Sequence, residues 1–190
     1  MKNRSLVFPA GRSMGYIQAR SGDYPYAFHG RFKKEGGLLD GVDNPGWQLL
    51  GGAFGQTDVD DDCVLLEVLA EPARDLSPLL RLKPDDLDAI WLGNTWVDDT
   101  QLRYLGHLTG LRWLNLENSA GVTDAGLAEL ASLTSLLHLG IHWTRVTDAG
   151  LLHLQSLKKL QFLDVWGCNV TAPALAELKA RLPKCLIRTE

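Results

Sequence analysis

Apolar residues recur at a nearly constant interval along the second half of the chain. Four leucines open successive units that lie 24, 25 and 24 residues apart: Leu87, Leu111, Leu136 and Leu160. In every unit an apolar residue follows three and five positions later, and in the third unit these are Leu139 and Ile141. Apolar residues that alternate over a few positions predict a short β-strand.

A second block completes each unit. Its four copies are Val97-Asp98-Asp99, Val122-Thr123-Asp124, Val146-Thr147-Asp148 and Val170-Thr171-Ala172. Leucines spaced three apart follow, such as Leu151, Leu154 and Leu157, and they predict a short helix. Thr and Asp oxygens satisfy free N–H groups at a helix start, so we expect the recurring aspartates to be structural.

A strand and a helix of this length cannot bury their leucines alone, so neighbouring units must stack. The strands are expected to form a parallel sheet on the concave side, with the helices on the convex side. This predicts an α/β solenoid. The third unit, 136–157, reads L-x-x-L-x-I-x-x-T-x-V-T-D-x-G-L-x-x-L-x-x-L. It resembles the bacterial leucine-rich repeats of the ribonuclease-inhibitor-like and F-box-associated subtypes. The resemblance implies a recognition surface but does not select a partner.

The chain before the repeats has a different composition. Residues 1–62 are rich in glycine and aromatic residues and lack the leucine period. We predict a β-rich N-terminal cap there, with an inserted loop at about 21–45. The strand-like pieces of residues 1–62 are 14–20, 24–32 and 47–54.

Two further regions complete the predicted organisation. Residues 63–86 are expected to form a degenerate capping repeat, with a strand at 64–68 and a short helix at 75–82. Their spacing is interpreted as departing from the repeat by about two residues. Residues 87–190 hold the leucine-rich repeats and a C-terminal cap, which includes a final strand within 182–188 whose outer edge could be exposed.

The positions between the leucines of a strand share one face, because successive side chains point to opposite sides of a sheet. On the concave face they bring together Trp91, Trp113, Asn115, Glu117, His138, His142, Trp143, Phe162, Asp164 and Trp166. A contiguous exposed aromatic patch is typical of an interaction surface, and tryptophan is enriched at interface centres. We therefore predict that these ten residues bind a partner. The alternative is that the rings stack on one another or are covered by the N-terminal insertion.

Charge narrows the class of partner. The formal net charge of −4 argues against a large basic surface for nucleic acid or anionic lipid. A protein or peptide partner, neutral or basic, fits better. No stretch approaches the roughly 20 apolar residues of a membrane span, and the N-terminus shows no signal-peptide core. With three widely separated cysteines as well, we expect a cytoplasmic protein without structural disulfides.

No motif indicates catalysis, a cofactor or a metal site. His138 and His142 are about 13 Å apart along a strand, which is too far for joint zinc ligation. Cys168 beside either histidine could be imagined as a catalytic pair, but it aligns with Thr95 and Thr144 at a position expected to turn inward. The acidic run 58–62 lacks the calcium-loop pattern and is interpreted as a solvated turn.

These observations favour a non-enzymatic protein-interaction module. Carbohydrate binding is the first alternative, because aromatic faces stack on sugar rings while amides and carboxylates bind hydroxyl groups. The second is self-association, including a homodimer, through the aromatic patch and the open edge of the sheet.

Overall fold

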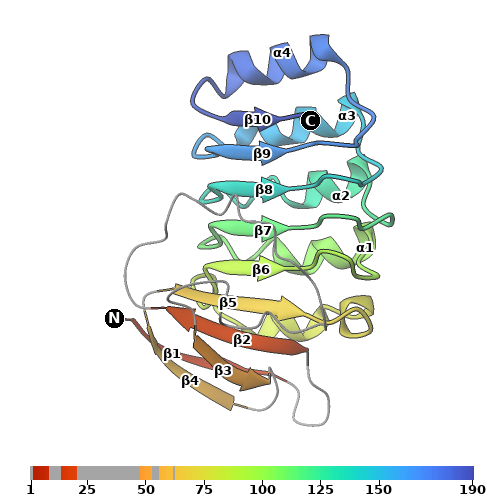
Figure 1. The fold of residues 1–190 in the computed structure, drawn as a ribbon. Helices are drawn as coiled ribbons and strands as arrows, with labels where there is room; N and C mark the ends of the chain where they lie inside the picture. The colour runs from red at the N-terminus through yellow and green to blue at the C-terminus, as the bar shows by residue number, and fades with distance from the viewer. Residues whose placement is uncertain (1, 9–13, 21–47, 53–55, 62) are drawn as a thin grey trace.

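A single parallel sheet organises the repeats. The computed structural model describes residues 2–8, 14–20, 48–52, 56–61 and 63–190. Six parallel strands stack as rungs (Figure 1): β5 (Cys63–Val68), β6 (Ala89–Trp91), β7 (Trp113–Asn115), β8 (His138–Gly140), β9 (Phe162–Asp164) and β10 (Leu186–Arg188). Each of β6 to β9 falls where the leucine spacing predicts it. The α/β leucine-rich-repeat solenoid is therefore confirmed.

The register of the sheet repeats the sequence interval. Ile90 pairs with Leu114, Leu114 with Leu139, and Leu139 with Leu163. These side chains are at most 1% exposed and point into one continuous core between the sheet and the helices. Burying a leucine contributes roughly 1.5–3 kcal/mol, so the repeated leucines supply most of the packing energy.

Short helices return the chain along one side of the sheet (Figure 1). The α-helices are α1 (Asp99–Leu102), α2 (Asp124–Glu129), α3 (Asp148–Leu151) and α4 (Ala172–Arg181). Four 3-10 turns accompany them: η1 (Pro72–Arg74), η2 (Ser77–Arg81), η3 (Arg103–Leu105) and η4 (Leu152–Ser156). Within the described ranges, no helix has the length and apolar character needed to cross a membrane.

The recurring aspartates link one repeat to the next. The N-cap of α3 is Thr147, whose hydroxyl accepts from the Ala149 N–H. Asp124, from the preceding unit, accepts both the N–H and the hydroxyl of Thr147, each at 2.7 Å. Asp99 makes the same pair of contacts with Thr123, and Asp148 makes it with Thr171. Their structural role is confirmed, but it is to hold the next cap rather than to cap their own helix.

The glycine of the Thr-Asp-Ala-Gly-Leu block leaves room for this aspartate. A Cβ atom on Gly150 would lie 2.4 Å from Asp124 Oδ1, and one on Gly126 would lie 2.4 Å from Asp99 Oδ1. Both distances are well below van der Waals contact. In these two units the glycine therefore leaves space for the aspartate, whereas the fourth unit carries Ala174 at the same position.

The N-terminal strands extend the repeat sheet. β2 (Gly15–Arg20) pairs antiparallel with β5, and β3 (Gln48–Gly52) pairs antiparallel with β2. Two of the three predicted strand-like pieces are thus strands, whereas the piece at 24–32 and the loop at 21–45 lie outside the described residues. Because β2 and β3 hydrogen-bond into the same sheet, the predicted boundary at residue 62 stays a prediction.

A second, two-stranded sheet lies below the first in Figure 1. It pairs β1 (Lys2–Val7) with β4 (Gln56–Asp61) in antiparallel register. The interpretation of 58–62 as a solvated turn is therefore wrong for 58–61, which belong to β4. Strand β1 was not predicted.

Strand β5 follows the repeat more closely than its sequence indicates. Leu65 pairs with Ala89, 24 residues later, so Cys63 stands where the other units begin with leucine. The predicted two-residue departure is wrong for this strand. The extra residues instead follow Leu82, where five positions separate it from Leu87 in place of the three found in later units.

Candidate functional site

The concave face is closed at one end and open at the other. Its first row crosses the strands in register: Leu65, Ala89, Trp113, His138, Phe162 and Leu186. Leu65 and Ala89 are fully buried and Trp113 is 8% exposed, whereas Leu186 is 58% exposed. The accessible part of the face therefore lies over β8 to β10.

Trp113 is a core residue of the closed end. Together with Cys63, Leu65 and Ala89 it forms a second buried cluster, against which Trp91 packs. The alternative of a covered ring therefore applies to Trp113, and the expectation that it is exposed is wrong. Its ring meets the His138 ring edge to face at 5.7 Å, which joins the buried cluster to the open rows.

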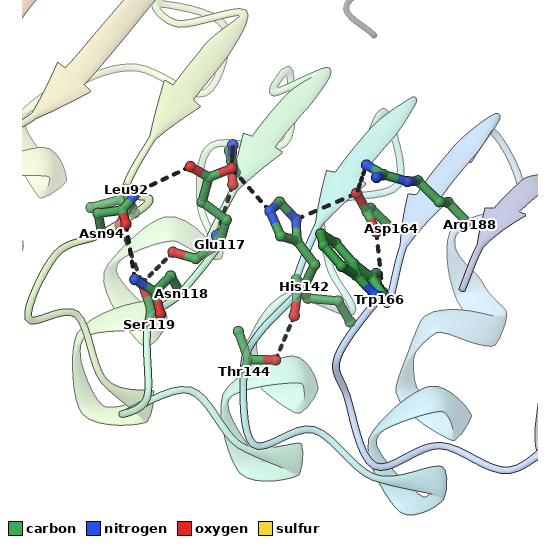
Figure 2. Close-up of polar contacts among 12 residues, drawn as sticks. Leu92, Asn94, Glu117, Asn118, Ser119, His142, Thr144, Asp164, Trp166 and Arg188 are labelled. Carbon is green, nitrogen blue, oxygen red and sulfur yellow. Dashed lines mark hydrogen bonds and ion pairs between the residues drawn. The ribbon is translucent and has the colours of Figure 1, made fainter. Parts of the chain in front are cut away.

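Charged side chains form a line across the loop ends of four strands (Figure 2). His142 Nε2 lies 3.2 Å from Glu117 Oε2, and His142 Nδ1 lies 3.4 Å from Asp164 Oδ2. Arg188 Nη1 lies 3.0 Å from the same Asp164 oxygen. The sequence placed Glu117, His142 and Asp164 on the concave face, but it did not indicate Arg188 as a partner.

Glu117 is surrounded by donors. Burial raises the pKa of its carboxyl, but hydrogen bonds from His142 and Asn115, the charge of His142 and a hydrogen bond from Asn94 together hold the pKa below its usual value. Gly93 leaves the space, since a Cβ there would be 2.5 Å from Glu117 Cγ. The environment therefore keeps this half-buried carboxylate ionised.

His142 lies between two carboxylates. Its Nδ1 atom is buried and makes no hydrogen bond of good geometry, although it is within ion-pair distance of Asp164. We treat this contact as electrostatic, because a 3.4 Å separation with poor alignment is a weak hydrogen bond. Only a doubly protonated imidazole presents N–H groups to both carboxylates.

Trp166 stacks against this line. Its backbone N–H donates to Asp164 Oδ1 at 3.1 Å, and the Arg188 guanidinium carbon lies 5.3 Å from the centre of its ring. The His142 ring is nearly parallel to it, 6.5 Å away at an interplanar angle of 21°. Trp166 remains 40% exposed.

Trp143 has an unusual backbone. Its φ is 57°, in the left-handed region, where the other units carry Asn94, Asn118 and Gly167. A Cβ on Gly167 would lie 2.8 Å from the Trp143 ring, so this glycine allows the indole to lie close to the backbone. The ring meets Trp166 edge to face at 5.3 Å and is 53% exposed.

The structure locates the cysteine that was considered as a catalytic partner of the two histidines. The Cys168 thiol donates to the Ile141 carbonyl at 3.0 Å and packs on the leucine core, which confirms its inward position. Glu117 and Asp164 both contact His142, and Asp164 is also paired with Arg188. Over the part of the chain that the structure describes, no three His, Cys, Asp or Glu side chains are arranged to hold a metal ion.

Comparisons with known proteins support the fold. The sequence matches no protein-family model and no curated protein. Among solved structures it is similar to internalin C2 of Listeria monocytogenes, with a TM-score of 0.51 and 23% identity, over 61% of this chain and 46% of that one.

Two further structures are similar over shorter shares of their length. A leucine-rich-repeat protein of Leptospira interrogans gives a TM-score of 0.41 and 21% identity, over 54% of this chain and 25% of that one. The Listeria monocytogenes internalin inlF gives 0.42 and 18%, over 60% and 37%. The chain thus spans less than half the length of each of the three structures. The likeness to internalin C2 shows a leucine-rich-repeat fold alone.

Proposed function

We propose that this chain is a non-enzymatic protein-interaction module that binds a protein or peptide partner on the open concave face, over β8 to β10. The observation that carries the proposal is Trp143. A left-handed conformation costs a residue other than glycine about 1–2 kcal/mol. Here the cost falls on a tryptophan whose ring is more than half exposed, while equivalent positions hold asparagine or glycine.

The proposed anchors are Trp143 and Trp166. They are in contact with one another, exposed, and supported from below by Gly167 and the charged line. Rigid aromatic side chains at the centre of a patch provide most of the binding energy in many interfaces. His138 and Phe162 are half-buried, contact one another, and lie on the same face nearer the start of strands β8 and β9. Trp113 is buried, so a binding role for it requires the closed end to open, whereas Trp91 is half-buried against the same cluster.

Affinity capture followed by direct titration tests the proposal. The wild-type chain and the Trp143→Asn, Trp166→Ala double variant are each used to capture proteins from a lysate of the source organism. A captured protein is then purified and titrated against both. We expect the double variant to lose at least about 2 kcal/mol of binding, as for interface anchors. Trp96→Ala removes an equally exposed tryptophan that contacts Arg74 instead, and should bind normally. Equal binding by the double variant would contradict the proposal.

Carbohydrate binding is supported by one feature. The amides of Asn94 and Asn118 form an exposed ladder next to Trp143, with Asn118 Nδ2 donating to Asn94 Oδ1 at 2.9 Å. A ring beside amides suits a sugar, which stacks while its hydroxyl groups bond to the amides. Binding on a glycan array that Trp143→Asn abolishes would favour this function over a protein partner.

Self-association is supported by the edge strand. β10 is an edge strand of the sheet that the described residues form, and its Leu186 is 58% exposed. Sedimentation of wild type against Leu186→Lys would reveal an edge-to-edge dimer as a loss of mass in the variant. The ribonuclease-inhibitor-like or F-box-associated repeat subtype and the cytoplasmic location expected from the sequence stay predictions.

A further inference from the structure

Asp164 is a buried carboxylate that faces one arginine and one histidine. Its side chain is 6% exposed, and its Oδ2 atom faces Arg188 Nη1 at 3.0 Å and His142 Nδ1 at 3.4 Å. A buried ionised group without a cation is strongly destabilising. This position must therefore be occupied by a positive group whenever the carboxylate is ionised.

The shape of the site suits a guanidinium. Arg188 contacts Asp164 while its planar group lies over the Trp166 ring at 5.3 Å. Arginine is suited to such a site because its flat, weakly hydrated group pairs with a carboxylate and stacks on an aromatic face together. A lysine ammonium would satisfy the charge but not the stacking.

A second Arg–Trp pair in the chain shows what distinguishes this one. Arg74 lies 5.0 Å from the Trp96 ring and pairs with Glu71 at 3.2 Å. The Glu71 side chain is 76% exposed, so water can solvate it when the arginine leaves. The Asp164 side chain is only 6% exposed, so water replaces a departing arginine there less readily, and the imidazole of His142 is the other side chain that faces the same oxygen.

Arg188 is held at the edge of the structure. It belongs to the three-residue strand β10, which pairs with β9 and is an edge strand of the sheet that the described residues form. One nitrogen of its group bonds to Asp164, while Nε donates to the Glu190 carbonyl, and the side chain is 46% exposed. Edge segments with few contacts open at lower free-energy cost than core strands.

We propose that Asp164, Trp166 and His142 form a guanidinium-binding site, that Arg188 is its resident occupant, and that an arginine side chain of the protein partner takes the place of Arg188. Exchange of one guanidinium for another leaves no buried charge unbalanced. The site itself stands without a partner, but its use in recognition rests on the proposed interaction function. The net charge of −4 is compatible with an arginine-bearing segment.

The first experiment tests the site with a small probe. The full chain with Arg188→Ala, carrying ¹⁵N-labelled tryptophan, is titrated with the peptide acetyl-Gly-Arg-Gly-amide while the indole NMR signals are followed. We expect the Arg188→Ala substitution to shift the Trp166 signal. Addition of the arginine peptide should then return the signal toward its wild-type position, with a millimolar dissociation constant. Acetyl-Gly-citrulline-Gly-amide has the same shape but no charge. It should bind at least about tenfold more weakly than the arginine peptide.

Two variants serve as controls. Arg74→Ala leaves Trp96 beside a solvated carboxylate, so its Trp96 signal should not respond to the arginine peptide. Arg188→Gln keeps an N–H donor for Asp164 and is used for the titration if Arg188→Ala does not fold. No saturable shift at Trp166, or equal binding of the arginine and citrulline peptides, would overturn the site.

The second experiment tests the exchange. The partner identified by affinity capture is titrated against wild type and Arg188→Ala. If Arg188 competes with an arginine of the partner, Arg188→Ala should bind the partner severalfold more tightly than wild type does. Replacing that arginine in the partner should then weaken its binding to Arg188→Ala. Weaker binding by Arg188→Ala itself would overturn the exchange. The proposed function fails if the partner binds equally well with and without the Trp143 ring. The peptide titration does not use the partner, so it tests the guanidinium site independently of that result.

Discussion

At the scale of single residues, two tryptophans of one concave face have opposite uses. Trp113 is 8% exposed inside a cluster, whereas Trp143 is 53% exposed on a strained backbone. We predict that Trp113→Ala lowers the free energy of unfolding by about 3 kcal/mol through the cavity it leaves. Trp143→Asn should stay within about 1 kcal/mol of wild type, because relief of strain offsets the lost ring contacts. Urea denaturation measures both. A large loss for Trp143→Asn would show that its ring is structural.

The lowered pKa of Glu117 makes part of the stability depend on pH. A carboxyl whose pKa is lower in the folded state contributes stability above its unfolded pKa, and loses it as pH falls through the folded value. We therefore expect wild type to exceed Glu117→Gln in stability at about pH 6, and the gap to close toward about pH 3. Denaturation of both proteins across this range tests the sign. Parallel stability curves would mean that the contacts to His142, Asn115 and Asn94 do not favour the ionised form.

At the scale of elements, the repeats are joined by aspartates, and two of these, Asp99 and Asp124, lie against a glycine of the next helix. In most helices Gly→Ala is stabilising, but a Cβ on Gly150 would collide with Asp124 Oδ1 and also approach Val146 Cγ1 at 3.0 Å. We predict that Gly150→Ala costs about 2 kcal/mol through overpacking. The control is Gly106→Ala, whose Cβ would meet the Ser132 Oγ atom at 3.3 Å, so a small shift of an exposed side chain suffices and the cost should be clearly lower than for Gly150→Ala.

A double-mutant cycle separates this collision from other effects. In an Asp124→Ala background, which itself loses two hydrogen bonds to Thr147, Gly150→Ala should cost clearly less than in wild type. Thermal or urea unfolding of the four proteins gives the coupling energy. Additive costs would show that the glycine is required for a reason other than the aspartate.

The repeat elements could be predicted from the sequence because the interval between the leucines is also the interval between paired residues of neighbouring strands. It predicted β5 less well, since Cys63 fills the place of a leucine there and hides the regular 24-residue interval. The strand pattern of β2 was recognised, but a pattern of residues does not state which sheet a strand joins. Such long-range pairing is set by packing rather than by local sequence.

The candidate site was predicted as a face but not as a set of contacts. Adding one repeat length places Arg188 beside Asp164, so the register itself could have revealed that pair. The left-handed position was also legible, because asparagine or glycine occupies it in three units. The burial of Trp113 could not be read in this way, since every unit assigns its position to the same face and burial depends on what covers it.

At the scale of the whole molecule, the repeats form a linear array in which internal and edge strands differ. Among the described strands, β5 is paired on both sides, by β2 and β6, whereas β10 pairs with β9 on one side. In a repeat array each unit contacts only its neighbours, so stability is a sum of local terms and ends open more readily than centres. The end that carries Arg188 is also the open end of the concave face, which places recognition where the array is least constrained.

Two buried cysteines report on this inequality. Cys63 lies in β5 and is 2% exposed, and Cys185 precedes β10 and is fully buried. Burial raises the pKa of the Cys185 thiol to about 11, although the charge of Lys179 lowers it in part, so in the closed state this thiol is protonated and unreactive. Alkylation of either residue therefore requires an opening of the structure, and its rate measures the free energy of that opening.

We predict that Cys185 is alkylated faster than Cys63 in dilute urea, because the unit that contains it can open without disturbing the rest of the sheet. Timed labelling with iodoacetamide, followed by mass spectrometry of the peptides, gives both rates in the unmodified chain. Rates in fully unfolded protein correct for intrinsic reactivity. Equal corrected rates with the same urea dependence would mean that the array unfolds as one cooperative unit, and the edge strand would then be too firmly held for Arg188 to exchange with an arginine of a partner.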